Sequence, residues 1–135
     1  MCDLQPDVEI RLPAAPPALA DVRRAVRDVA AHGHVGRDHT EVAALLASEA
    51  SANVIRHTHA PVIDLTVGCL GDHLVIRVGD DDPTPITPRP LALDRLSGRG
   101  LLIIDRLAGR WGVDLRTHGK EVWLETAIHQ GGPTD

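Results

Sequence analysis

Two pairs of alternating apolar runs constrain the fold of this chain more than any other feature. In each run every second residue is apolar, apart from Thr117 and Thr126 at the ends of the second pair, which is the pattern of a half-buried strand. Gly71-Asp72 separates the first two runs and suits a tight turn with glycine first, and His118-Gly119 separates the second two. Two hairpins predict a mostly antiparallel sheet. The first pair covers residues 63–69 and 74–78, and the second covers residues 113–117 and 122–126.

Two helices are expected before these hairpins. Apolar residues at helical spacing predict an amphipathic helix over residues 18–32, which Gly33 would end. A second helix is predicted over about residues 40–58. Asp38 and Glu41 resemble a capping box at its start.

The predicted element order is β-α-α-β-β-α-β-β. A short strand at residues 8–12 opens the chain, and an apolar helix at residues 101–107 lies between the hairpins. A long loop over residues 80–99 precedes that helix and is typical of lids and binding loops. Helices on one face of a mostly antiparallel sheet make an α+β fold, a two-layer α/β sandwich.

Length and composition favour one globular domain. We expect a single domain over residues 1–135, with loose ends at 1–6 and 129–135. The net charge of −5 argues against a general affinity for phosphate backbones. Besides histidine, Trp111 and Trp123 are the only aromatic residues, so platforms for base stacking are missing. We therefore expect no direct binding of nucleic acid.

Several other functional classes lack support in the sequence. Two cysteines make no disulfide framework, and we find neither a signal-peptide pattern nor an apolar run near eighteen residues. A cytoplasmic protein without membrane contact is the expectation. The eight histidines lack the spacing of zinc ligands, and no Gly-x-Ser-x-Gly elbow is present. Lys120 does not stand in a Walker-loop context.

The second predicted helix carries polar residues on a face expected to point into the core. Glu49, Asn53 and His57 are spaced i, i+4, i+8 and therefore stack along one side. A carboxylate and a carboxamide there cost several kcal/mol unless something binds them. Either the protein's own backbone satisfies them, or they line a ligand cavity. In the second case Asn53 could offer an oxygen to Mg²⁺, and Glu49 could act as a base. The same face carries Val42, Leu45 and Leu46.

Two further candidates follow the first hairpin. Asp80 ends a buried strand, where an inward carboxylate needs a donor; alternatively, the run of three aspartates is a solvated turn before Pro83. Gly98, Arg99 and Gly100 precede the third predicted helix, whose free N–H groups could bind phosphate. Glycines of this kind are also common in plain loops.

The order of these three signals resembles the GHKL, or histidine kinase-like, ATPase family. The closer resemblance is to its single-domain branch of anti-sigma-factor serine/threonine protein kinases and their actinobacterial ATP-binding relatives. The matching stretches are Glu49 to His57 for the N box, Val78 to Pro83 for the first adenine-contacting box, Ser97 to Asp105 for the second glycine box, and Arg110 to Val113 with Gly119 to Trp123 for the two closing strands.

This resemblance implies a Bergerat-type ATP-binding fold and a role for each matching residue. Asn53 would bind the Mg²⁺ that bridges the ATP phosphates, and Glu49 would be the base that activates a protein hydroxyl. Asp80 would hydrogen-bond the adenine amino group, and the loop over residues 84–96 would be the lid. The phosphates would be cradled by Gly98, Arg99, Gly100 and Leu101.

The resemblance also implies partners and leaves one alternative open. A sigma factor and an anti-anti-sigma (STAS-type) protein would bind the chain, and the chain could form a homodimer. Asp82 replaces the usual glycine of the first box, and Glu121 replaces a small hydroxyl residue expected near the adenine. These departures favour the alternative, a non-catalytic GHKL-fold module that binds a partner with weak or no ATP binding.

Overall fold

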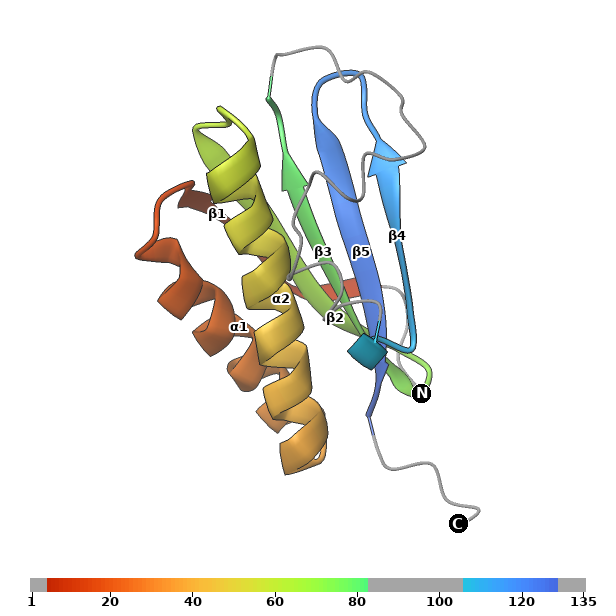
Figure 1. Ribbon diagram of the computed structural model, residues 1–135. Helices are drawn as coiled ribbons and strands as arrows, with labels where there is room; N and C mark the ends of the chain where they lie inside the picture. Colours follow the sequence, from red (N-terminus) through yellow and green to blue (C-terminus); the bar gives the residue numbers. More distant parts are fainter. Residues whose placement is uncertain (1–4, 83–105, 129–135) are drawn as a thin grey trace.

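The computed structural model describes residues 5–82 and 106–128, in which two helices cover one face of a five-stranded sheet (Figure 1). This arrangement confirms the predicted α+β two-layer sandwich. The elements are β1 (Gln5–Pro13), α1 (Ala18–His32), α2 (Arg37–His57), β2 (Val62–Leu70), β3 (His73–Asp80), β4 (Arg110–Leu115) and β5 (Lys120–Ala127). The strands lie in the order β1-β2-β3-β5-β4, and all neighbours are antiparallel.

Both hairpins form where the alternation predicts them. Leu70 pairs with His73, so Gly71-Asp72 is a two-residue turn, and Gly71 takes a φ of 61° that costs glycine little. In the second hairpin, β4 begins at Arg110, earlier than expected, and ends at Leu115, so the predicted strand to residue 117 is too long and the turn covers residues 116–119 rather than His118-Gly119 alone. The alternation is hard to see there because Gly112 has no side chain. The Trp123 ring occupies the space that a Cβ at this position would take.

The N-terminal part of the chain also differs in detail from expectation. β1 already includes Gln5 and Pro6, two residues assigned above to a loose end. Of the helix predicted over residues 101–107, the structure describes Arg106 and Leu107, both in helical conformation. The predicted lid and most of that helix lie outside the described residues.

The core lies between the helices and the sheet face that they cover, here called the inner face. Leu65, Val78 and Val122 are register partners on that face and are almost fully buried. On α2, several of the residues that face the core are small, and Ala43, Ala47 and Ala50 are fully buried. Small side chains let the helix pack closely on its neighbours.

The polar stripe of α2 lies at the edge of its buried side. Leu46 is fully buried as expected, but Leu45 is 39% exposed, so its assignment to the core face is wrong. Because the alanine-rich side of α2 packs inward, the line through Val42 and Glu49 is only half-buried. The stripe therefore borders the core and enters it at Asn53.

The predicted capping box is also wrong. α2 begins at Arg37 after Gly36, which provides the extended N-cap backbone (φ −58°, ψ 150°) without a side-chain cap. The Gly36 N–H donates to the carbonyl of Ile128, which ties this helix end to the end of β5. Glu41 is instead paired with Arg27 of α1 through two hydrogen bonds.

Candidate functional site

Asn53 is a buried amide without a hydrogen-bond partner among the described residues. Its side chain lies on α2 and is 2% exposed, yet neither Oδ1 nor Nδ2 is paired. A buried polar group left unpaired costs about 1–3 kcal/mol. Self-satisfaction by backbone, the first alternative above, is therefore not what the described part of the chain shows. An amide held in this way fits a site that a ligand completes.

Glu49 precedes Asn53 by one helical turn. It is half-buried, and no hydrogen bond or ion pair joins it to another described residue. Its carboxylate is thus available as a base. His57, the third member of the predicted stripe, is the last residue of α2.

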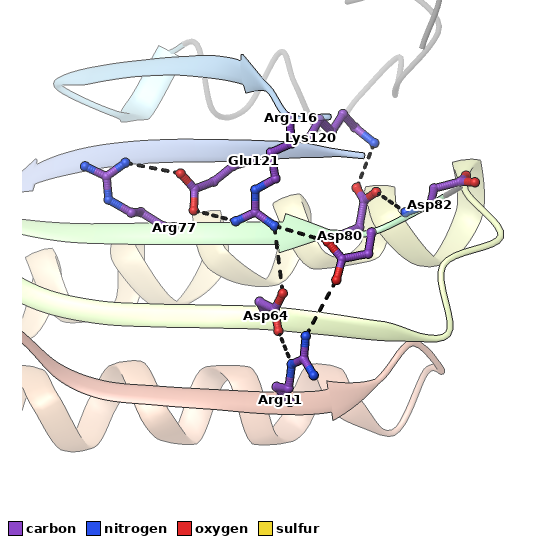
Figure 2. Close-up of polar contacts among 9 residues, drawn as sticks. Arg11, Asp64, Arg77, Asp80, Asp82, Arg116, Lys120 and Glu121 are labelled. Atoms are coloured by element: carbon purple, nitrogen blue, oxygen red, sulfur yellow. Dashed lines mark hydrogen bonds and ion pairs between the residues drawn. The ribbon is translucent and has the colours of Figure 1, made fainter. Parts of the chain in front are cut away.

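Asp80 ends β3 on the inner face with its carboxylate already engaged. Its side chain is 1% exposed, and Lys120 donates from Nζ to Oδ2 at 3.1 Å (Figure 2). The other oxygen, Oδ1, accepts the backbone N–H of Asp82 at 3.1 Å. The reading of this run as a solvated turn is wrong for Asp80 and Asp82, which are buried, whereas Asp81 is exposed.

Lys120 is a residue of the candidate site that the sequence patterns did not single out. It begins β5 directly opposite Asp80, and its side chain is 10% exposed. The signal was present in the alternation, because Lys120 shares its strand face with Val122 and Leu124. A lysine on an apolar face predicts a buried carboxylate partner.

Gly119 fixes the second hairpin against the end of β3. Its φ of 91° favours glycine, and a Cβ at this position would collide with the backbone carbonyl of Asp80. The same hypothetical Cβ would lie 2.7 Å from Asp80 Oδ1. The turn therefore packs directly on the carboxylate and places Lys120 beside it.

Asp82 has a structural role at the position where the resemblance described above leads one to expect glycine. Its Oδ2 accepts the backbone N–H of His59 at 3.0 Å. His59 follows the C-cap of α2, Thr58, so the contact joins the end of this helix to the end of β3. The departure from glycine thus supplies a tie between two walls of the site.

Glu121 does not face Asp80. It lies on the outer face, the side of the sheet opposite the helices, and pairs with Arg77 at 3.3 Å and Arg116 at 2.9 Å (Figure 2). Alternation in β5 turns Lys120 inward and Glu121 outward, so Lys120 and not Glu121 lies beside Asp80. Arg116 also contacts Asp64, which pairs with Arg11 of β1 at 2.7 Å.

The structure places some predicted site residues and leaves others undescribed. Asn53 and Glu49 lie together on α2, and Asp80 lies at the end of β3. Within residues 5–82 and 106–128, no group of three His, Cys, Asp or Glu side chains is placed to hold a metal ion. A divalent ion at Asn53 would depend on ligand oxygens, as Mg²⁺ bound to phosphates does. The phosphate cradle lies outside the described residues: Gly98, Arg99, Gly100 and Leu101.

Neither of the described helices is both long enough and apolar enough to cross a membrane.

Comparison with known proteins identifies relatives of this chain. A family model described as the histidine kinase-like ATPase domain matches residues 12–126. An uncharacterized protein of Streptomyces coelicolor is 38% identical over 85 residues, which cover 59% of this chain and 80% of that protein. The crystal structure of the SiaB–SiaC complex from Pseudomonas aeruginosa contains a similar chain, with a TM-score of 0.61, 16% identity and 91% of each chain covered. At that identity the likeness shows a shared fold.

Proposed function

Because the chain belongs to the family of histidine kinase-like ATPase domains, we propose that it binds ATP and Mg²⁺ and acts as a serine/threonine protein kinase. Its phosphoacceptor is an anti-anti-sigma protein of the STAS type, and the same chain holds a sigma factor in the cytoplasm. The observation that carries the proposal is the buried amide of Asn53, which has no hydrogen-bond partner in the part of the chain that the structure describes. A ligand that bonded to this amide would remove the free-energy cost of leaving a buried polar group unpaired, so Asn53 fits a ligand site.

The family resemblance supplies each proposed role. Asn53 would hold Mg²⁺ through Oδ1, and Asp80 would accept a hydrogen bond from the adenine amino group. Glu49, unpaired among the described residues, would accept the proton of the acceptor hydroxyl as that oxygen bonds to the γ-phosphorus. When bound, ATP would supply the γ-phosphoryl group and leave as ADP, and Mg²⁺ would neutralise the phosphate charge. Transfer then depends mainly on positioning, so few protein groups are needed.

A second function has its own support. The Asp80 carboxylate is bound by Lys120, which favours a non-catalytic module that holds a partner with little or no nucleotide. The SiaB–SiaC structure is a complex by its title, so a similar fold occurs in a protein assembly. A homodimer is compatible with either function.

Transfer of label separates the two functions. The protein is incubated with γ-labelled ATP, Mg²⁺ and candidate anti-anti-sigma proteins, and label on the acceptor is measured. The kinase proposal expects transfer by the wild type, and a loss of about a hundredfold or more in Glu49→Gln with nucleotide affinity retained. If no acceptor is labelled and a partner binds tightly regardless of nucleotide, the binding module is the correct function.

A further inference from the structure

The carboxylate of Asp80 is closed on both of its oxygens. Oδ1 packs against Gly119 and accepts the N–H of Asp82, and Oδ2 accepts from the Lys120 ammonium. With the residue 1% exposed, a ligand reaches the carboxylate only after one of these contacts opens. The first two involve the backbone of Gly119 in the hairpin turn and of Asp82 just after β3. The third involves only a flexible side chain, so Lys120 is the contact that can open.

The exchange of Lys120 for a ligand donor is costly. Lys120 forms a charge-assisted hydrogen bond with Asp80, which is about twice as strong as a bond between neutral groups. The amino group of a purine base is a neutral donor and replaces that bond with a weaker one. The affinity of the base therefore depends on the energy needed to remove the ammonium from Oδ2.

The position of Lys120 makes its removal possible without unfolding. Its side chain retains 10% exposure at the first residue of β5, so the ammonium can reach solvent by rotation of its four-carbon stem. Arg77 and Arg116 are paired with Glu121 on the outer face. Among the described residues, Lys120 is therefore the cation paired with the Asp80 carboxylate.

We propose that Lys120 is a specificity-determining residue that competes with the base of a bound nucleotide for Asp80. The inference rests on the proposed function, because it assumes that the same carboxylate receives the base. It makes a prediction opposite to that of simple charge attraction. A lysine that attracted ATP phosphates would strengthen binding, whereas a lysine that competes for Asp80 weakens it.

Substitution of Lys120 measures this competition. Lys120→Met removes the ammonium and keeps an apolar stem, and we expect it to bind Mg-ATP about tenfold or more tightly than the wild type in calorimetric titration. Lys120→Arg retains a cation and should show no gain. The gain should also vanish with purine ribonucleoside triphosphate, which lacks the 6-amino donor. Equal or weaker ATP binding by folded Lys120→Met overturns the inference, as does an equal gain for both nucleotides.

A measurement on the wild-type protein avoids any effect of substitution on folding. Lys120 is the only lysine in the chain, so its acetylation by an amine-reactive ester can be followed in one peptide by mass spectrometry. We expect saturating Mg-ATP to accelerate acetylation severalfold, because the base releases the ammonium. Slower or unchanged acetylation at saturation overturns the inference.

The two proposals fail in different ways. If the wild type binds ATP but Lys120 is not released and Lys120→Met shows no gain, only the competition is wrong. If neither the wild type nor Lys120→Met binds ATP, the proposed nucleotide site is wrong as well. Binding by Lys120→Met alone supports the competition and shows that the wild-type site is held shut.

Discussion

Single residues at the end of β3 hold the candidate site in shape. Asp80 is bonded by Lys120 and by the N–H of Asp82, and Gly119 packs on its backbone. Asp82 in turn reaches the backbone of His59. These contacts link β3, the second hairpin and the segment after α2 within one short stretch of structure. Even a small change of side chain here should therefore lower the free energy of unfolding markedly.

Gly119 offers the sharpest test of this packing. Gly119→Ala should lower the free energy of unfolding by more than about 3 kcal/mol, because left-handed backbone and a collision with Asp80 act together. Gly71→Ala is the matched control: Gly71 also has a positive φ, but nothing lies within 4 Å of the added Cβ. Urea unfolding should show a loss of only about 1 kcal/mol for the control. Similar losses in both variants would mean that the collision at Gly119 is relieved cheaply.

Asp82 tests the tie to α2. Asp82→Gly restores the residue usual in the family but removes the acceptor for the His59 N–H, and we expect a loss of about 1 kcal/mol in urea unfolding. Asp82→Asn keeps an acceptor oxygen and should lose less. A glycine variant as stable as the wild type would show that the hydrogen bond contributes nothing measurable.

At the scale of elements, periodicity predicted most of the fold. Alternation located both hairpins, and helical spacing located α1 with Gly33 as its C-cap. The start of α2 was missed because Gly36 adopts the cap conformation without a capping side chain. Leu45 was misplaced because spacing alone does not reveal that the alanines of α2 define its buried side. Such details depend on packing between elements, which no local pattern encodes.

The ion pair between α1 and α2 gives a pH-dependent prediction. Hydrogen bonding and charge from Arg27 lower the pKa of Glu41 below its ordinary value. A depressed carboxyl pKa stabilises the fold above the unfolded pKa, and this contribution disappears as the pH falls through the folded pKa. NMR titration should find the pKa of Glu41 lower in the wild type than in Arg27→Gln. Arg24→Gln, which changes a neighbouring arginine of α1, should leave it unchanged; equal pKa values in all three proteins would contradict the pairing.

At the scale of the whole molecule, the two faces of the sheet carry different chemistry. The inner face is apolar except at Asp80, Lys120 and Thr126. The outer face carries a line of ion pairs across β1, β2, β3 and β5 (Figure 2). Asn53, Glu49 and Asp80 stand out in the sequence because each is a polar residue in an apolar pattern. The pairing of Lys120 with Asp80 and of Glu121 with Arg77 depends on how the strands pair, and the sequence does not give the register to the residue.

Arg116 lies at the centre of the row of ion pairs on the outer face, so its contribution to the free energy of unfolding should depend on salt concentration. It contacts Glu121, Asp64 and Asp81 while its side chain is 32% exposed. Arg116→Met should lose about 1 kcal/mol of unfolding free energy at low ionic strength, and less at about 1 M salt, where charges are screened. Arg24→Met, whose exposed pair with Asp21 spans 3.8 Å, should lose almost nothing. A loss at Arg116 that is the same at both salt concentrations would show that packing, not charge, is responsible.

The proposed function depends most on the buried amide of Asn53, which we propose to be part of the nucleotide site. Calorimetric titration with Mg-ATP should be compared for the wild type, Asn53→Ala and Ser51→Ala. Ser51 is an equally buried residue of α2 whose Oγ also has no partner among the described residues. We predict that Asn53→Ala loses Mg-ATP affinity by at least about a hundredfold while remaining as stable as the wild type, and that Ser51→Ala binds normally. Unchanged affinity in Asn53→Ala, or an equal loss in both variants, would contradict the account.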